Sequence, residues 1–597
     1  MSENKYLEQN SRWRNTSQTL APSKHEPTPP GQYDLYPAFP ISPDSIQVGY
    51  EVLAEYALQH GLLRIDGYVG VFWDVFRDRL EESLAQLGTH ARWVDVTQAM
   101  SSETEIETLV EPYLGGNDPL FGTRFTGTLV DFFDSKKLAE LAVLSDGELT
   151  ILYGCGAGLV ELSSQLVYVD LPKNELQFRS RANRAANLGM TSPQPPKSAY
   201  KRFYFVDWIA LDKHKKSLLE EIDLFVDGQH PDQPPSVAGE TVRGALEQMS
   251  HNYFRVRPWF EPGPWGGQWI KENIPKLPQD VPNYAWSFEL ITPENGLMLE
   301  DGNCLFEVSF DWIMAHDNRA VLGDSAVRFG YEFPIRFDYL DTFDGGNLSV
   351  QCHPRPKYIR HHFGETFTQD ETYYILDCTE DSQVYLGFNE GIDPDAFRNM
   401  LEQSNQKGNR IDIGQFVKTV PAQKHDLFLI PSGTIHCSGT NNLVLEISAT
   451  PYIFTFKMYD WLRMDLEGNP RPLNIDRAFE NLHFDRQGDY VEQHLISHPC
   501  VLEEEESWRV VHLPTHADHF YDVRRLEFDH DIDCETAGSC QVMCLVEGSV
   551  VTLETHEGMR ARFNFAETFV VPAAARSFRL INEGDERALV VQAFLKA

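Results

Sequence analysis

Two patterns of hydrophobic and polar residues follow each other along the chain. In the first, an apolar run such as LLRIDGYVGVF is followed by a stretch with apolar residues at intervals of three and four, such as VFRDRLEESLAQLG. This order recurs up to about residue 235, and the alternation of strands with helices predicts an α/β domain with a parallel sheet. In the second, short runs such as CLFEVSFDWIM, DLFLIPSG and NLVLEIS are separated by Gly, Asn, Asp and Pro, which predicts antiparallel barrels or jelly rolls.

The two patterns divide the chain into four predicted segments. Residues 1–45 are polar and rich in proline, and we interpret them as an arm that lies on the surface or is partly disordered. Residues 46–235 are the α/β domain, and the stretch DGQHPDQPPSVAGE around its end is the best candidate for a linker. Residues 236–495 and 496–597 are two successive β barrels. The predicted fold class is therefore α/β plus all-β.

Length, charge and cysteine content narrow the class of protein. The 597 residues exceed what one hydrophobic core normally serves, so two to four domains are expected. The formal net charge of −38 argues against nucleic acid and membranes as partners, but a locally basic pocket can still bind a small anion. Nine cysteines without a CxxC pair, and no apolar run or leader of targeting type, predict a soluble cytoplasmic protein. The oligomeric state, a homo-oligomer included, stays open.

Three separate segments offer side chains that can ligate a metal. Gln351 and His353 are two residues apart in LSVQCHP, so a strand would aim both into one space. Glu371 opens the next apolar strand, and His436 follows the turn in IPSGTIH. Together they would supply two nitrogen and two oxygen ligands, a set acceptable to zinc and also to manganese, iron or nickel. The alternative is that His353 and His436 are ordinary polar residues at strand ends.

The surrounding motifs resemble those of a known enzyme family. Pro431–His436 fits the cupin signature P-x-G-x-x-H, and the chain more narrowly resembles the class I mannose-6-phosphate isomerases over roughly residues 252–490. The motifs that carry the likeness are LSVQCHP, DETYYIL, IPSGTIH, LVLEIS, PWGG and YDW. The resemblance implies two cupin barrels after the α/β domain.

The resemblance also implies an activity and a cofactor. The activity is that of an intramolecular oxidoreductase, which interconverts mannose 6-phosphate and fructose 6-phosphate through an enediolate. The implied cofactor is one zinc ion per chain, with another divalent metal as the alternative. Carried over by position, the metal ligands are Gln351, His353, Glu371 and His436.

Further residues are implied to surround the reacting atoms. Glu446 is an inward acidic residue near the metal, and the candidates for the acid/base are Glu446, a water on the metal, and His361 or His362. Lys457 stands where the family has an active-site Arg, and it would stabilise the enediolate or hold the phosphate as a point charge. Gln369 replaces a Lys that the family often has at this position. Whether the substrate carries a phosphate in the usual place is therefore left open.

Both flanking domains resemble families whose ligand-binding residues are missing here. IDGYVGVFWDVF has the strand, glycines and helix of uridine-kinase-like P-loop proteins, but Val71, Phe72 and Trp73 stand where the phosphate-binding Lys and hydroxyl belong. We expect a degenerate kinase-like fold without kinase activity, and GCGAG at Gly154–Gly158 is a weaker glycine-rich lead. The C-terminal domain resembles a cupin whose signature is reduced to VPAAARSF, with Ser577 in place of the His. No metal is expected there.

Two other functions remain open beside the isomerase. The changes at Gln369 and Lys457 favour a non-catalytic or regulatory metal-containing cupin that binds a sugar or a sugar phosphate, whereas the intact ligand set favours the enzyme. A third interpretation is an isomerase of another sugar, an unphosphorylated one included. In each case the expected partner is a small sugar or sugar phosphate.

Overall fold

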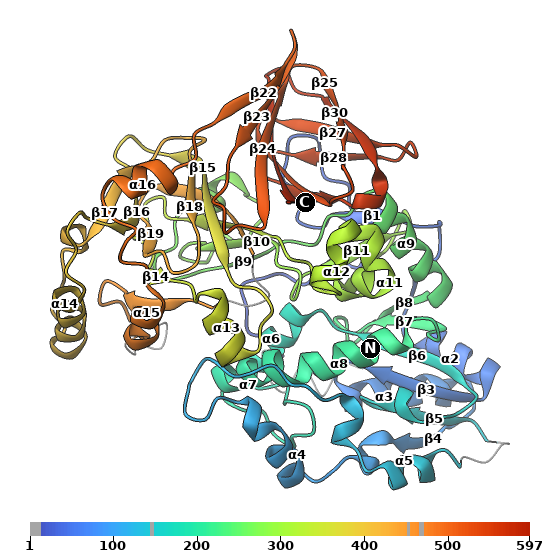
Figure 1. Cartoon of the computed structure of the whole chain (residues 1–597). Coiled ribbons are helices and arrows are strands. Elements are labelled where there is room, and N and C mark those ends of the chain that lie inside the picture. The colour runs from blue at the N-terminus through green and yellow to red at the C-terminus, as the bar shows by residue number, and fades with distance from the viewer. Residues whose placement is uncertain (1–12, 144–147, 450–453, 465–470, 597) are drawn as a thin grey trace.

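The computed structural model describes residues 13–143, 148–449, 454–464 and 471–596. Figure 1 shows an α/β unit in blue and cyan at the bottom, a central β unit in yellow and orange, and a C-terminal barrel in red at the top. Residues 1–12 of the predicted arm lie outside the described residues. No helix in the described part of the chain is long and apolar enough to cross a membrane.

A seven-stranded sheet forms the α/β unit. The strands β4, β5, β3, β6 and β7 are parallel and adjacent in that order, and β8 and β2 extend the sheet antiparallel at one edge. The predicted parallel sheet is therefore confirmed. The strands are β2 (Gln47–Val48), β3 (Leu62–Gly67), β4 (Arg92–Asp95), β5 (Thr150–Tyr153), β6 (Gln165–Asp170), β7 (Leu224–Asp227) and β8 (Pro235–Ala238). The helices are α2 (Tyr50–His60), α3 (Trp73–Gln86), α4 (Glu103–Val110), α5 (Ser135–Leu141), α6 (Lys173–Arg181), α7 (Pro196–Arg202) and α8 (Trp208–Leu218).

The central unit contains two main sheets with the orders β18-β15-β20-β13-β10-β9 and β17-β16-β19-β14-β21. Leu443 and Leu445 of β20 lie in a hydrophobic cluster shared with the C-terminal barrel, whereas Val444 between them lies in another cluster. Both faces of this strand are buried, which explains its nearly continuous apolar sequence. The strands are β9 (Trp259–Glu261), β10 (Trp286–Leu290), β13 (Arg336–Asp341), β14 (Val350–Cys352), β15 (Asp370–Cys378), β16 (Gln383–Phe388), β17 (Val417–Pro421), β18 (Leu427–Ile430), β19 (His436–Ser438), β20 (Asn442–Ala449) and β21 (Phe456–Tyr459).

The C-terminal barrel has sheets of order β22-β23-β24-β31-β26-β29 and β25-β30-β27-β28. It packs on the central unit, where the Tyr521 hydroxyl donates to the carbonyl oxygen of Ile447 at 2.8 Å. The strands are β22 (Cys500–Glu504), β23 (Trp508–Leu513), β24 (Tyr521–Phe528), β25 (Asp531–Glu535), β26 (Gln541–Glu547), β27 (Val550–Thr555), β28 (Arg560–Asn564), β29 (Thr568–Val571), β30 (Ser577–Asn582) and β31 (Ala588–Leu595).

Two sequence interpretations differ from the structure near residue 235 and beyond. The stretch interpreted as a linker contains β8, which pairs with β7 and is mostly buried, and helix α9 (Gly239–His251) follows it. In CLFEVSFDWIM only β12 (Leu305–Ser309) is a strand, and the helix α11 (Asp311–Leu322) begins two residues later. A buried strand and a buried helix both give short apolar runs, so periodicity alone does not separate them.

The described part of the arm is also more than a surface segment. Its strand β1 (Ala38–Pro40) pairs in parallel with β11 (Gly296–Glu300), and Tyr33 and Phe39 are buried in the largest hydrophobic cluster. The backbone N–H of Gly31 donates to Asn564 of the C-terminal barrel at 2.8 Å. Prolines keep the regular part of the arm short, but single apolar side chains still anchor it.

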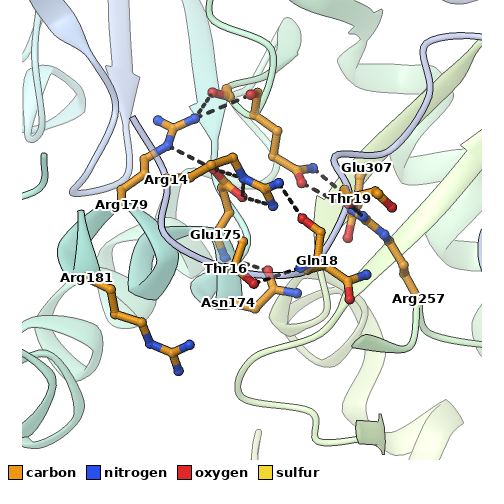
Figure 2. Close-up of polar contacts among 12 residues, drawn as sticks. Arg14, Thr16, Gln18, Thr19, Asn174, Glu175, Arg179, Arg181, Arg257 and Glu307 are labelled. Carbon is orange, nitrogen blue, oxygen red and sulfur yellow. Dashed lines mark hydrogen bonds and ion pairs between the residues drawn. The ribbon is translucent and has the colours of Figure 1, made fainter. Parts of the chain in front are cut away.

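Figure 2 shows how the arm is held between the α/β unit and the central unit. Arg14 contacts Glu175 of α6 at 2.9 Å, and the fully buried Arg179 reaches the same carboxylate at 3.3 Å. On the other side, Arg257 pairs with Glu307 of β12 at 2.8 Å and donates to a carbonyl oxygen of the arm. The arm therefore links the two units through buried charges.

A second buried network lies at the carboxyl end of the parallel strands. Lys215 of α8 contacts Asp170 of β6 at 3.0 Å and Asp311 of α11 at 2.9 Å, and it is 1% exposed. Lys173 of α6 contacts the same Asp311 at 2.9 Å. Asp170 also accepts a hydrogen bond from the backbone N–H of Ser309 at 2.6 Å. Because unpaired buried charges are costly, this network fixes how the two units dock.

A third contact between the units places two carboxylates on one guanidinium. Arg124 lies 2.9 Å from the buried Glu365 and also contacts Glu332, and the Tyr204 hydroxyl donates to Glu365 at 3.0 Å. Burial raises the pKa of Glu365 to about 7, because Arg124 offsets only part of the desolvation and Glu332 adds repulsion.

Replacement of Lys215 by Met should destabilise the docked units. The variant leaves the fully buried Asp170, and Asp311 with its side chain 24% exposed, with one cationic partner fewer. Breaking a buried pair such as Lys215–Asp170 costs about 3–5 kcal/mol. We expect the free energy of unfolding to fall by that amount in denaturant titrations followed by circular dichroism. Lys213→Met, on the exposed face of the same helix, is the control and should change it by less than about 0.5 kcal/mol. Equal unfolding midpoints for the two variants would contradict the role given to the network.

Replacement of Glu365 by Gln should change how stability depends on pH. The folded-state pKa lies above that of the unfolded chain, so the contribution of Glu365 to stability is fully present below about pH 4.5 and is lost as the pH rises to about 7. We therefore expect the melting temperature of the variant, relative to wild type, to rise between pH 5 and pH 8. For Glu380→Gln, at an exposed position, the difference in melting temperature from wild type should stay constant between pH 5 and pH 8. If the melting temperatures of Glu365→Gln and wild type changed with pH in parallel, the raised pKa of Glu365 would be refuted.

Candidate metal centre

Three side chains from the two main sheets of the central unit meet in its interior. Glu371 lies on β15, His436 begins β19, and His353 directly follows β14. The Nε2 atoms of His353 and His436 lie 2.5 and 3.4 Å from Glu371 Oε2. All three side chains are fully buried. Within the described residues, they form the one cluster of His, Cys, Asp and Glu that can hold a metal ion.

Both histidines are oriented by backbone carbonyl oxygens. Nδ1 of His353 lies 2.9 Å from the carbonyl oxygen of Phe454, and Nδ1 of His436 lies 3.0 Å from that of Thr434. A proton on each Nδ1 makes these hydrogen bonds and leaves a lone pair on each Nε2, which faces Glu371. Such lone pairs and a carboxylate repel each other at these distances unless a proton or a metal cation lies between them. The same outer hydrogen bonds orient histidines that ligate metals.

Two further observations fit a divalent cation at this place. Glu371 Oε1 is buried and has no hydrogen-bond partner among the described residues. The side-chain amide of Gln351 lies 3.4 Å from His436 Nε2, and turning that amide by 180° would offer its oxygen to the same point. The chain thus brings together the four predicted ligands, and their donor set suits zinc and other divalent ions.

Sheet register explains why these residues converge. Gln351 of β14 lies opposite His436 of β19 on one side and Lys457 of β21 on the other. Glu446 of β20 comes from the other main sheet, where it lies opposite Asp338 of β13. Alternate residues of a strand point to the same face, so each strand supplies one or two polar side chains to the interior.

Arg336 and Asp338 belong to this site but were missed in the sequence. Arg336 donates to both oxygens of Asp338 at 3.2 and 3.1 Å and lies 3.3 Å from Glu446 Oε1. Burial raises the pKa of Glu446 well above its usual range, and repulsion from Asp338 and Glu371 adds to the effect. The signal was present in IRFDYLD, where charged residues occupy alternate positions of an apolar strand.

A cavity of about 440 Å³ adjoins the cluster. Gln351, Gln369, Glu446 and Lys457 line it from the central unit, as does Arg336. Its volume is in the range of small-molecule sites. Four residues singled out in the sequence are therefore gathered around one space.

Lys457 stands in a basic part of the cavity wall. Burial and the neighbouring Arg471 lower the pKa of Lys457 to about 8, although Asp460 acts in the opposite direction. Asp460 binds Arg471 at 2.6 Å and Arg463 at 2.7 Å. One carboxylate thus serves two guanidinium groups, and Lys457 is left facing the cavity.

Other candidates are not brought to this site. His361 and His362 lie exposed on α13 (Pro356–Phe363), where His362 stacks on Tyr358, and neither lines the cavity. In the C-terminal barrel, Ser577 begins β30, and the part of that barrel that the structure describes holds no cluster of metal-ligating side chains.

Comparison with known protein families and curated proteins gives a family match and several similar proteins. Residues 49–251 match a family model described as a domain of unknown function, DUF8485. The chain is 32% identical over 235 residues to the probable mannose-6-phosphate isomerase GmuF of Bacillus subtilis, which covers 39% of this chain and 68% of that protein. It is 26% identical over 224 residues to mannose-6-phosphate isomerase ManA of the same organism, covering 38% of this chain and 66% of the relative. The chain thus spans about two thirds of the length of these relatives.

Solved structures are also similar in part. The mannose 6-phosphate isomerase from Bacillus subtilis aligns over 57% of this chain and 99% of its own, with a TM-score of 0.45 and 17% identity. A putative mannosephosphate isomerase from Archaeoglobus fulgidus aligns over 58% of this chain and 98% of its own, with a TM-score of 0.43 and 18% identity.

Replacement of His436 by Ala should remove bound metal. We expect purified wild-type protein to carry about one divalent ion per chain by plasma mass spectrometry, and the variant to lose nearly all of it, because two of the remaining ligands, Gln351 and Glu371, bind more weakly than imidazole. His425→Ala is the matched control, since the ring of His425 contacts Tyr374 and Glu547 instead. A full complement of metal in His436→Ala would show that the ion lies elsewhere.

Proposed function

Because this chain belongs to the mannose-6-phosphate isomerase family, we propose that it is a metal-dependent isomerase that interconverts mannose 6-phosphate and fructose 6-phosphate. The observation that carries the proposal is a cavity close to the His353, Glu371 and His436 cluster: Gln351, whose amide lies 3.4 Å from His436 Nε2, lines it together with Glu446 and Lys457. An acid/base group close to the metal cluster is what an isomerase needs in addition to a binding cavity.

The proposed reaction moves one proton between C1 and C2 of the open-chain sugar, and the hydroxyl and carbonyl oxygens exchange roles. When bound, the divalent ion, which we propose to be zinc, polarises the substrate carbonyl and stabilises negative charge on its oxygen. Glu446 is the proposed carrier of the proton, because it lines the cavity together with Gln351 and Lys457. Arg336 holds Glu446 in place through its contact at 3.3 Å.

Lys457 has a second role in this scheme. Its ammonium group faces the cavity beside Gln351 and can donate to an oxygen that gains negative charge during the proton transfer. As a point charge it replaces the bidentate Arg of the family, so it stabilises charge but fixes orientation less strictly.

Gln369 favours a second candidate, an isomerase of a sugar without phosphate at the family's usual position. Its Oε1 atom is buried, lines the cavity and has no hydrogen-bond partner among the described residues. An amide oxygen accepts from a sugar hydroxyl, whereas the lysine of the family is suited to a phosphate. A non-catalytic sugar-binding protein remains the alternative from another functional class.

For the α/β unit we propose a P-loop-kinase-like fold that no longer transfers phosphate. Counted along the chain, its parallel strands have the order 2-3-1-4-5, and the glycine turn follows the central strand β3 at the edge where α/β sheets bind ligands. The space a phosphate would need is filled. The Arg179 guanidinium donates to the carbonyl oxygen of Gly70 at 2.9 Å and lies over the Phe72 ring, and a Cβ on Gly70 would lie 2.5 Å from Leu176.

Replacement of Glu446 by Gln should abolish turnover without loss of metal. Loss of a positioned acid/base costs about 10²–10⁴-fold in rate, so we expect kcat on mannose 6-phosphate in a coupled assay to fall by at least about 100-fold. Glu503→Gln, on the exposed strand β22, is the control and should keep wild-type kcat. Metal-loaded wild-type protein that turns over neither mannose 6-phosphate nor free sugars would rule out the isomerase.

A further inference from the structure

The cavity beside the metal cluster is not closed by the isomerase-like part of the chain alone. Ser180 and Arg181 of α6, together with Lys197 and Tyr200 of α7, line it from the α/β unit. These residues fall inside 49–251, the range of the DUF8485 match, and outside the segment that resembles the isomerases. The region of the DUF8485 match and the segment with isomerase-like motifs therefore share one cavity.

The wall formed by α6 and α7 is bonded to the central unit. Arg181 pairs with Glu261 of β9 at 2.7 Å, and the Tyr200 hydroxyl donates to Glu294 at 2.5 Å. Glu261 and Glu294 also line the cavity. Charged and hydrogen-bonded contacts at the rim hold the two helices at a fixed distance from the barrel, so the cavity has a defined shape before any ligand enters.

Polar atoms without partners point to a ligand in this cavity. Ser180 and Trp259 line the cavity, and their Oγ and Nε1 atoms have no hydrogen-bond partner among the described residues. Each of these side chains is 3% exposed or less. Buried hydroxyl and indole N–H groups nearly always have a partner, so two unpaired donors in residues of the cavity wall fit a ligand rich in oxygen atoms.

Positive charge is concentrated in the same space. Lys197, Lys457 and Arg471 all line the cavity, and Lys197 is near enough to Lys457 for the two ammonium groups to repel each other. Asp460 compensates Arg471, but it also binds Arg463. On a chain with a net charge of −38, such a basic wall is suited to an anionic ligand.

We propose that the α/β unit forms part of the substrate site, in which Lys197 and Arg471 hold the phosphate of the sugar phosphate and Ser180 donates to one of its oxygens. The inference rests on the proposed isomerase function and extends it, because it assigns phosphate recognition to a unit that lies outside the segment with isomerase-like motifs. The proposal also accounts for Gln369. If the phosphate lies nearer to α7 than in the family, the residue at the position of the family's lysine contacts a sugar hydroxyl instead of the phosphate.

Kinetics of Lys197→Met test the proposal. A charge-assisted contact to phosphate is worth about tenfold or more in affinity, so KM for mannose 6-phosphate should rise at least tenfold while kcat stays within about twofold. Lys213→Met, an exposed lysine of α8 in the same unit, is the matched control and should keep the wild-type KM. A wild-type KM in Lys197→Met would overturn the assignment.

Binding of inorganic phosphate, measured by calorimetry on the metal-loaded full chain, gives a readout that does not need turnover. Lys197→Met should weaken phosphate binding at least tenfold, and Ser180→Ala, which removes a single hydroxyl, should weaken it about threefold to tenfold. Unchanged affinity in both variants would overturn the proposal even if the protein is an active isomerase. If wild type has no isomerase activity, the proposed function fails, and the phosphate affinities of the variants still decide the role of α6 and α7.

Discussion

The buried charges at the carboxyl end of the parallel sheet fix the arrangement of the whole molecule. Asp170 and Lys215 come from the α/β unit, and Asp311 comes from the helix that follows β12. Each is costly to bury alone and stable only when the others are present, so the two units have one favourable way to dock. That orientation brings α6 and α7 against the barrel and completes the cavity beside the metal cluster. The edge of the sheet at which α/β proteins bind ligands has become an interface.

Much of the metal centre was predictable because its signals are local. Gln351 and His353 share a face two residues apart, and Glu371 and His436 stand at defined points of strands and turns. The role of a residue is harder to predict from the sequence when it depends on partners far away in the chain. Arg336 reads as one charge in a strand until its contact with Glu446, more than a hundred residues away, is seen. Lys197 is an exposed residue of α7, and its place in the cavity wall is seen only once α7 lies against the central unit.

In the fold, too, local signals were predictive, whereas contacts between distant segments were not. The repeated alternation of strand and helix patterns identified the parallel sheet, because the hydrophobic periodicity of a segment reflects its own secondary structure and the face that it buries. The segment around β8 was interpreted as a linker because its prolines and glycines are typical of loops, yet its backbone completes a sheet edge. The arm was interpreted as a surface segment for a similar reason. The composition of a segment averages over all its residues, so it does not reveal that two single side chains, Tyr33 and Phe39, are buried in the hydrophobic core.

The arm also has a consequence for the order of folding during synthesis. Gly31 precedes its partner Asn564 by 533 residues in the sequence. This contact of the arm therefore cannot form until the C-terminal barrel has been translated, although the pairing of β1 with β11 can form earlier. Closing such a long loop is entropically unfavourable, and it becomes stable only once both barrels exist. A segment that precedes both barrels in the sequence thus completes its contacts only after both barrels have been made.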